Sequence, residues 1–195
     1  MFVPCGGRPE SVDLSTVGRL IEDKKSSIAY FVEGANLFMT QDARLRLEQA
    51  GAVVFKDASV NKGGVTSSSL EVLASLAFDD NGFIQHMCVN NDGKVPDFYQ
   101  SYVKEVQEVI KRNARFEFEA IWREHEETGK PRSVLSDKIS VAIVTLDNQL
   151  QHSDLWNDLQ LRKSILKDAL PKTLIEKIGF ETVIERVSWL CPIVK

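Results

Sequence analysis

The chain has 195 residues, of which 43% are hydrophobic and 27% charged, a balance typical of globular proteins and unlike that of disordered ones. Its 24 basic and 28 acidic side chains give a net charge of -4, and no basic block indicates a nucleic-acid partner. No stretch approaches the ~18 consecutive apolar residues of a membrane-spanning helix, so we expect no membrane partner.

Short apolar runs alternate with amphipathic segments in the first 78 residues. The pattern predicts a strand stub at Phe2, a helix over residues 15–22, a strand over 28–32, a helix over 41–50, a strand over 52–55 and a helix over 66–77. Thr40 is a good N-cap for the second helix, and Gly51 is a good stop. Alternating strands and helices indicate parallel pairing and a sheet covered on both faces.

We therefore predict an α/β fold with a partial, Rossmann-like parallel sheet over residues 1–78. Three strands are few for a doubly wound sheet, so this region is expected to be the second half of a dinucleotide-binding domain.

The remainder, residues 79–195, is predicted to be a helical C-terminal region. Residues 79–97 form a polar connector with turn signals. Helices are expected over residues 97–127, 133–150, 155–169 and 173–178, with Gly179 ending the last. The second of these is expected to turn Ile143 and Leu146 inward.

Three predicted loops follow the carboxyl ends of the strands, where open parallel sheets bind ligands. They cover residues 4–7, 33–36 and 57–64; each contains glycine, and the last two contain Asn36 and Asn61. An asparagine amide both donates and accepts hydrogen bonds, which suits a ribose hydroxyl or a carboxamide. Ordinary turns remain the alternative, because glycine and asparagine are common in turns.

Hydroxyl residues are concentrated at the predicted start of the helix over residues 66–77. Residues 66–69 are Thr-Ser-Ser-Ser, more than capping requires, and the positive end of a helix suits a carboxylate or phosphate. Capping by one hydroxyl, with Glu71 completing a capping box, is the alternative. The acidic run over residues 117–127 is interleaved with basic residues and is expected to be a solvated helix face.

The cysteines and histidines are few and scattered. Cys5, Cys88 and Cys191 are an odd number without a Cys-x-x-Cys pair, which favours a reducing compartment. No pair of histidines has ligand spacing, so we predict no metal site. The N-terminus lacks the features of a secretory signal, and we expect a cytoplasmic or mitochondrial location.

The chain contains the segment Glu-Gly-Ala-Asn at residues 33–36, followed by Asp57, Asn61, Gly63, Gly64 and a serine-rich helix start. This pattern resembles the cofactor domain of glutamate dehydrogenases. The flanking residues 2–10, 37–44 and 121–126 are similar to the large NAD-specific glutamate dehydrogenases of the fungal type. The likeness runs from residue 2 to about residue 187 and fades over residues 188–195, which suggests truncation or a misread gene model.

The resemblance implies an enzyme of amino-acid catabolism that oxidises L-glutamate to 2-oxoglutarate and ammonium, passes hydride to NAD and works as a homo-oligomer. It implies a cofactor site in which Cys5 and Gly6 lie near the adenosine, Gly34 and Asn36 lie at the nicotinamide riboside, and Asn61 and Gly63 lie at the nicotinamide. It also implies that Ser68 holds a substrate carboxylate. Lys62 departs from smaller members, which usually have alanine, and is expected to put a cation near the site.

Two expected parts of such an enzyme have no counterpart in the sequence. No Gly-x-Gly-x-x-Gly follows a strand, and the substrate domain with its lysine and aspartate is absent, so no catalytic residue is predicted. We therefore expect a C-terminal portion that is inactive by itself. The alternatives are a non-catalytic fragment that binds dehydrogenase subunits, and a stand-alone nucleotide-binding module. Because the phosphate cradle is missing, we expect NAD binding by this chain to be weak or absent.

Overall fold

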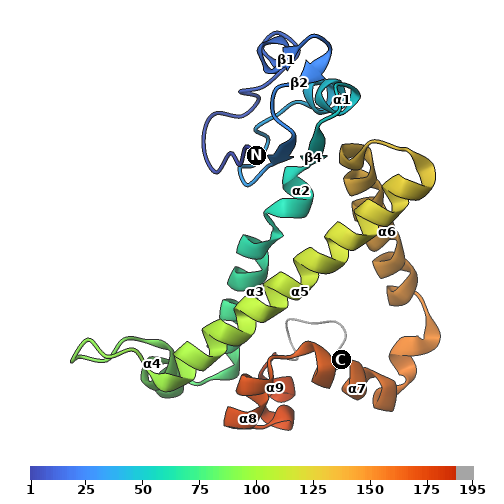
Figure 1. Ribbon diagram of the computed structural model, residues 1–195. Coiled ribbons are helices and arrows are strands. Elements are labelled where there is room, and N and C mark those ends of the chain that lie inside the picture. Colours follow the sequence, from blue (N-terminus) through green and yellow to red (C-terminus); the bar gives the residue numbers. More distant parts are fainter. Residues whose placement is uncertain (188–195) are drawn as a thin grey trace. The chain divides into compact units, whose positions relative to one another are not determined.

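The computed structural model describes residues 1–187 and divides the chain into two compact units (Figure 1). The first unit comprises Met1–Gly64 and Arg112–Thr145, and the second comprises Val65–Lys111 and the segment that begins at Leu146. Three long helices have residues in both units. The domain boundary expected after residue 78 stays a prediction.

A small parallel sheet lies in the first unit. β3 (Tyr30–Val32) pairs with β4 (Val53–Phe55), and a parallel bridge joins Phe2 to Phe31. The bridge is held by the Phe2 N–H, which donates to the Tyr30 carbonyl at 2.8 Å, and by the Val32 N–H, which donates to the Phe2 carbonyl at 3.0 Å. Parallel pairing is thus confirmed. The described residues do not confirm a full Rossmann-like sheet, because their parallel strands are only these two and the bridge.

Helices lie over both faces of this sheet. Phe31 and Val54 are buried beneath η1 (Val17–Leu20) and α1 (Gln41–Gln49). α1 forms as expected: the Thr40 hydroxyl accepts the Ala43 N–H at 3.3 Å, and Gly51, at φ 85°, follows the helix end. On the other face, the sheet and α5 (Asp97–Thr128) border a hollow of about 430 Å³, lined by Tyr30, Val32, Phe55, Phe118, Ile121 and Trp122.

The helix expected over residues 15–22 is wrong. Only the short turn η1 forms, and it leads into a two-stranded antiparallel hairpin of β1 (Ile21–Glu22) and β2 (Lys25–Ser26). The Asp13 carboxylate accepts N–H groups of Ser15 and Thr16, a local turn that competes with helix. The Ser26 N–H donates to the Ala50 carbonyl at 2.9 Å, which ties the hairpin to the end of α1.

The loop expected over residues 57–64 is also wrong. Two helices, α2 (Asp57–Val60) and α3 (Lys62–Ala77), follow β4, and Asn61 joins them. Gly63 is therefore helical, and the hydroxyls of residues 66–69 lie in the second turn of α3 instead of at its N-terminus. In that turn, backbone N–H groups are already engaged within the helix, so they offer no anion cradle.

Helices make up the described part of the second unit. They include α4 (Asp80–Met87), η2 (Asp154–Asn157), α7 (Leu159–Ala169), α8 (Lys172–Ile178) and α9 (Phe180–Val187), with parts of α3, α5 and α6 (Arg132–Gln151). The core contains Ala74, Ala77, Phe78, Tyr102, Val106, Leu174, Val183 and Val187. The long helix expected over residues 97–127 is confirmed.

Two expectations about the helical region fail. The polar connector contains α4, because the Asp79 carboxylate caps it by accepting the Gly82 N–H at 2.7 Å and Phe83 packs on the core. Ile143 and Leu146 of α6 are 54% and 55% exposed instead of inward. The buried residues of α6 are confined to its first turns.

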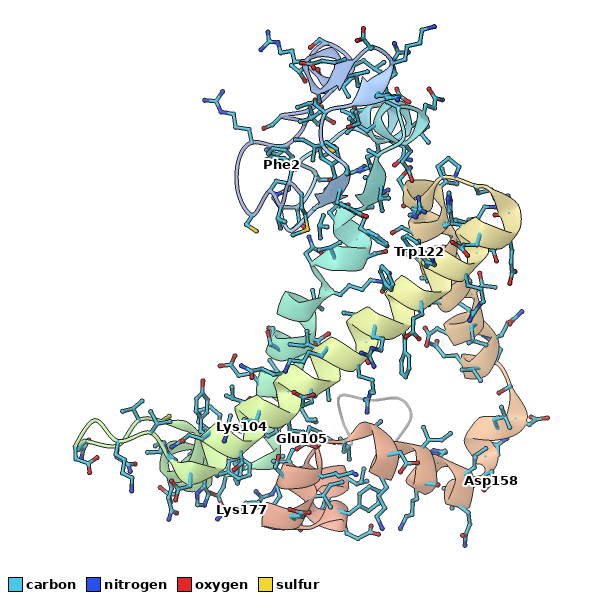
Figure 2. All side chains as sticks on the ribbon, in the orientation of Figure 1. Phe2, Lys104, Glu105, Trp122, Asp158 and Lys177 are labelled. Atoms are coloured by element: carbon cyan, nitrogen blue, oxygen red, sulfur yellow. The ribbon has the colours of Figure 1, made fainter. Side chains whose placement is uncertain are left out.

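A carboxylate from α5 caps α8 within the second unit (Figure 2). Glu105 accepts the N–H of Lys172 at 2.7 Å, the N–H of Thr173 at 3.0 Å and the Thr173 hydroxyl at 2.6 Å. A helix of only seven residues thereby gains partners for its free N–H groups. In the described part of the chain, no helix has the length and apolar character needed to cross a membrane.

Candidate functional site

The loops that follow Phe2 and β3 touch at the carboxyl ends of the strands. The Ala35 N–H donates to the Pro4 carbonyl at 2.7 Å. A Cβ atom at Gly34 would lie 3.1 Å from the Cys5 Sγ and 3.2 Å from the Pro4 carbonyl oxygen. Only glycine fits this approach without a shift of its neighbours, so the structure brings Cys5 and Gly34 together.

The amides of Asn36 and Asn61 meet at the same edge. The Nδ2 of Asn61, the residue between α2 and α3, donates to the Oδ1 of Asn36 in the loop that follows β3. Among the described residues, the side-chain amino group of Asn36 and the side-chain carbonyl of Asn61 have no protein partner. One donor and one acceptor are therefore available side by side, which suits a ligand carboxamide or hydroxyl.

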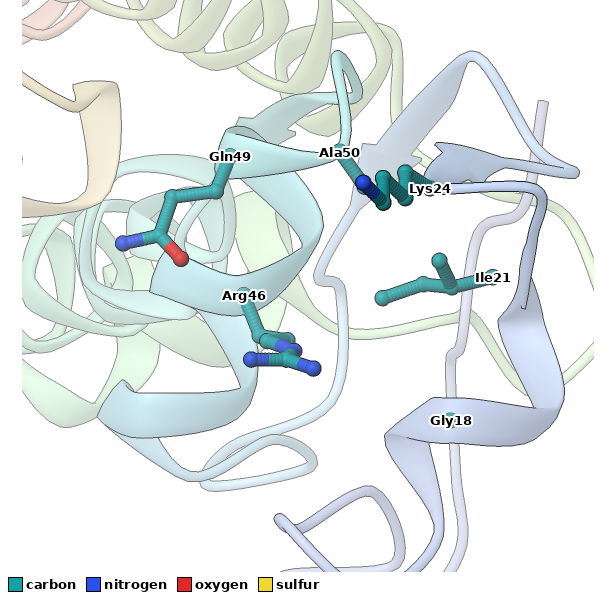
Figure 3. Close-up of a pocket in the computed structure, with 6 residues that line it drawn as sticks. All are labelled: Gly18, Ile21, Lys24, Arg46, Gln49 and Ala50. Carbon is teal, nitrogen blue, oxygen red and sulfur yellow. The ribbon is translucent and has the colours of Figure 1, made fainter.

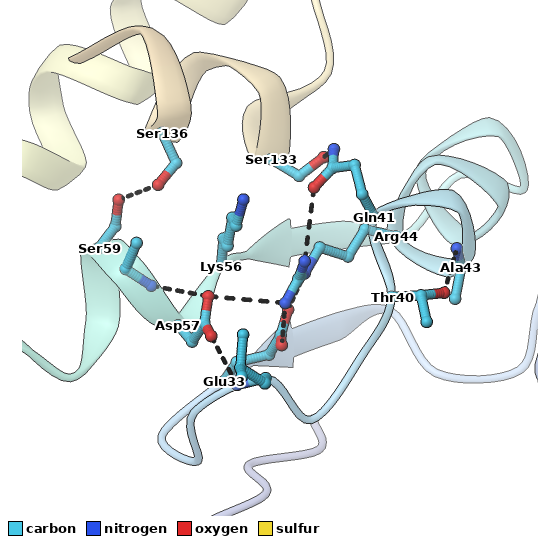
Figure 4. Close-up of polar contacts among 12 residues, drawn as sticks. Glu33, Thr40, Gln41, Ala43, Arg44, Lys56, Asp57, Ser59, Ser133 and Ser136 are labelled. Carbon is cyan, nitrogen blue, oxygen red and sulfur yellow. Dashed lines mark hydrogen bonds and ion pairs between the residues drawn. The ribbon is translucent and has the colours of Figure 1, made fainter. Parts of the chain in front are cut away.

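A buried ion network lies beneath these loops (Figure 4). Arg44 of α1, which is 4% exposed, donates two hydrogen bonds to the fully buried carboxylate of Glu33. The Arg44 Nε lies 2.7 Å from the Glu33 Oε1, and the Arg44 Nη2 lies 2.9 Å from the Glu33 Oε2. The same Nη2 lies 3.5 Å from the Oδ1 of Asp57, which is 6% exposed. Burial alone would lower the pKa of Arg44, but the carboxylates outweigh it and raise that pKa.

Asp57 connects the network to the backbone of the loop that carries Asn36. Its Oδ2 accepts the Leu37 N–H at 2.7 Å, and Leu37 adopts a left-handed φ of 56°. Its Oδ1 accepts the Ala58 N–H at 2.8 Å at the start of α2. A non-glycine residue at positive φ is costly and persists only where other contacts hold it. The carboxylate therefore holds the Asn36 loop against the start of α2.

Sequence reasoning missed Arg44. Its guanidinium pairs with a carboxylate eleven residues earlier in the chain, and this separation carries no helical or strand period. The only sequence signal was a charged residue between the apolar positions Ala43 and Leu47 of an expected amphipathic helix.

Polar contacts also fix the start of α6 within the first unit. Glu48 accepts the Arg132 N–H at 2.6 Å and the Ser133 hydroxyl at 2.7 Å, and Lys56 pairs with Asp137 at 2.6 Å. Ser59 and Ser136 share a hydroxyl contact (Figure 4).

Lys62 has a protein partner instead of standing free near a ligand. Its Nζ lies 2.7 Å from both carboxylate oxygens of Glu117 on α5. The Glu117 side chain is only 12% exposed, so the expectation of a fully solvated acidic face is wrong at this position.

The remaining predicted residues lie on two elements. Gly6 is exposed in the same loop as Cys5. Gly63 and Ser68 both lie on α3, Gly63 in the first unit and Ser68 in the second. The ligand roles of all these residues stay predictions. Residues 1–187 contain no cluster of three or more histidine, cysteine, aspartate or glutamate side chains that could hold a metal ion.

Comparison with known proteins links the chain to dehydrogenases. The family described as Glutamate/Leucine/Phenylalanine/Valine dehydrogenase matches residues 1–129. A Neurospora crassa protein named NAD-specific glutamate dehydrogenase is 70% identical over 187 residues. A Schizosaccharomyces pombe protein named probable NAD-specific glutamate dehydrogenase is 54% identical over 188 residues, and the Saccharomyces cerevisiae NAD-specific glutamate dehydrogenase is 46% identical over 192.

The alignments cover most of this chain and a small part of its relatives. The alignment with the Neurospora protein covers 96% of this chain and 18% of that protein. The alignment with the Schizosaccharomyces protein covers 95% of this chain and 17% of that protein, and the alignment with the Saccharomyces protein covers 96% and 18% in the same order. No solved structure matches the chain.

Proposed function

Because the chain belongs to the Glutamate/Leucine/Phenylalanine/Valine dehydrogenase family, we propose that it supplies one wall of the NAD and glutamate cleft of an NAD-dependent glutamate dehydrogenase. That enzyme oxidises L-glutamate with NAD and water to 2-oxoglutarate, ammonium and NADH. The observation that carries the proposal is the contact between Asn36 and Asn61 at the carboxyl ends of neighbouring parallel strands.

Each side chain has a distinct role in this proposal. Asn36 and Asn61 present one donor and one acceptor to the nicotinamide riboside and the carboxamide. Gly34 and Gly63 allow the backbone to pass close to the cofactor, and Cys5 and Gly6 border its adenosine side. Ser68 holds the substrate carboxylate. Arg44, Glu33 and Asp57 touch no ligand and keep the Asn36 loop in place.

The isolated chain is inactive in this proposal. Hydride transfer needs substrate and cofactor held at reacting distance, and these 195 residues contain no lysine–aspartate substrate domain of the expected kind. The complete enzyme is a homo-oligomer, and it works in the cytoplasm or the mitochondrion.

A chimera tests the proposal. This chain replaces the matching 187-residue segment of the Neurospora relative, and NADH formation from glutamate and NAD is measured. We expect the chimera to be active, and Asn61→Ala to lower its kcat/KM for NAD about tenfold through the loss of one hydrogen bond. Lys25→Gln, an exposed change on the hairpin, is the matched control. A folded, assembled chimera without activity would contradict the proposal.

Exposed apolar side chains favour a second candidate, a non-catalytic chain that binds dehydrogenase subunits. Leu155, Leu159 and Ile165 are each more than half exposed, and a contiguous patch of such side chains would be typical of a surface that packs against a partner. Copurification of the tagged chain with the full-length Neurospora relative would support this candidate. A monomer that leaves that enzyme unbound would exclude it.

A further inference from the structure

A second hollow lies in the first unit, at the sheet edge opposite the strand ends considered so far. α1 begins after the carboxyl end of β3 and ends just before the amino end of β4, so its last turn lies at the amino ends of the strands. The hollow, about 500 Å³, is lined by Gly18, Ile21, Lys24, Arg46, Gln49 and Ala50 (Figure 3).

The lining residues carry positive charge and no negative charge. Lys24 comes from the hairpin and Arg46 from α1, and both side chains extend toward the hollow in Figure 3. Among residues 1–187, neither side chain has a hydrogen bond or ion pair with another protein group. Two cations therefore border one hollow, and neither forms an ion pair with a carboxylate of the described residues.

The backbone at Lys24 is unusual. Asp23 and Lys24 form the two-residue turn between β1 and β2, with φ values of 48° and 65°. Such turns favour asparagine and glycine, because other residues pay about 1–2 kcal/mol at positive φ. A lysine in this conformation is a strained position that brings a cation to the end of α1, and strain of this kind is found at ligand sites.

The end of α1 would repel an anion if its carbonyl groups were free. Most of them are occupied: Ala50 N–H donates to Arg46, Ala52 N–H to Leu47, and Gly51 N–H to Glu48. The Ala50 carbonyl accepts the Ser26 N–H of the hairpin. Among the described residues, the Gln49 carbonyl has no protein partner, and the ionised side chains that line the hollow are those of Lys24 and Arg46.

We propose that this hollow binds a small phosphate-bearing anion. The guanidinium of Arg46 offers a planar fork that matches phosphate oxygens, and the ammonium of Lys24 adds a second charge. The Gln49 amide supplies a neutral donor, and Ile21 supplies an apolar wall for an organic group. The ligand is either free phosphate or a small phosphate monoester.

Calorimetry on the 195-residue chain tests the site, at low ionic strength because salt screens surface charges. The probes are inorganic phosphate and glycerol phosphate. We expect saturable binding of at least one probe, weakened about fivefold by Lys24→Gln and by Arg46→Gln, as suits the loss of one surface ion pair. Tighter binding of glycerol phosphate would identify a monoester as the ligand, and equal or tighter binding of inorganic phosphate would identify free phosphate.

The matched control is Lys25→Gln, which removes the same charge one residue further along the hairpin and does not line the hollow. It should leave the affinity within about twofold. Because the side chains of Lys24 and Arg46 make no hydrogen bond to protein groups among the described residues, both test variants should melt at the wild-type temperature. No saturable binding of either probe, or an equal loss in Lys25→Gln, would overturn the proposal. Neither result bears on the cofactor edge.

Discussion

Gly34 lies where two of the predicted ligand loops pack closely against each other. The Pro4 carbonyl and the Cys5 sulfur both lie where its side chain would start. Cys5 can rotate away, but the backbone oxygen of Pro4 accepts the Ala35 N–H and is fixed.

Gly34→Ala should therefore lower the free energy of unfolding by about 1–2 kcal/mol, the usual cost of overpacking. Urea denaturation measures the change. The double variant Cys5→Ala/Gly34→Ala should recover only part of the loss, because it removes the sulfur contact and keeps the clash with Pro4. Full recovery would show that the carbonyl contact does not matter.

Arg44 is the only cation that bridges the buried Glu33 and Asp57 among the described ion pairs. Arg44→Met should lower the free energy of unfolding by about 3 kcal/mol, because it leaves two buried carboxylates without their partner. Arg44→Lys should cost less, since it keeps the charge and loses the two-pronged geometry. The control is Arg46→Gln on the same helix, and equal effects of the changes at 44 and 46 would contradict this account.

The sequence predicted that Asn36 and Asn61 lie close together, but it did not predict the buried ion network that holds the Asn36 loop. Parallel strands place their carboxyl ends at one edge, so two post-strand asparagines had to lie near each other. Arg44 and Glu33 could not be paired in this way, because burial of a charged side chain depends on the tertiary fold and not on local spacing.

At the scale of elements, helices with regular apolar spacing were predicted well. The helix over residues 41–50 and the long helix from residue 97 were found within a residue or two. Two errors arose where a short polar contact decides the local structure: the Asp13 carboxylate forms a turn over residues 13–16, and the Asp79 carboxylate caps α4. A third error was the turn predicted at Gly63 and Gly64, which are helical. Glycine lowers helix propensity, and tertiary context overrides it.

Gly64 provides a direct test of whether residues 62–64 are helical, as the structure shows, or form a turn, as the sequence predicted. An added Cβ would meet nothing within 4 Å, so Gly64→Ala should raise the free energy of unfolding by about 0.5–1 kcal/mol. A turn at this position would give the opposite sign if it required positive φ. Thermal and urea unfolding of the single variant decide between the two.

Glu105 gives a pH-dependent test at the start of α8. Burial alone would raise the pKa of Glu105, but the hydrogen bonds from Thr173 and Lys172 and the Lys172 charge outweigh it and lower that pKa. A lowered folded-state pKa means that the carboxylate stabilises the fold above the ordinary glutamate pKa. This stability is lost as the pH falls through the lower pKa of the folded state.

Glu105→Gln should therefore cost about 1 kcal/mol at neutral pH, as for loss of a helix cap. The difference from wild type should shrink as urea unfolding is repeated toward about pH 3, where the carboxylate of the unfolded chain is protonated. Glu108→Gln is the control, since that side chain is exposed and has only an ion pair within its own helix. A cost that does not change with pH would contradict the assignment.

At the scale of the whole molecule, the residues predicted the family and the parallel pairing, and the division into two compact units was not foreseen. The first unit combines the sheet, whose last strand ends at Phe55, with residues 112–145, which come much later in the chain. Apolar spacing along a helix predicts that one face is buried and does not say against which element. For the same reason, Ile143 and Leu146 were expected inside and are exposed.

The central claim is that Asn36 and Asn61 form the nicotinamide half of an NAD site. The most direct measurement is an NMR titration of the 195-residue chain with millimolar NAD, following the side-chain amide signals of both asparagines. We predict weak, saturable shifts at these two amides, and their loss in Asn36→Ala/Asn61→Ala. Unchanged Asn36 and Asn61 signals at saturating NAD, or shifts confined to residues away from the strand ends, would contradict the account.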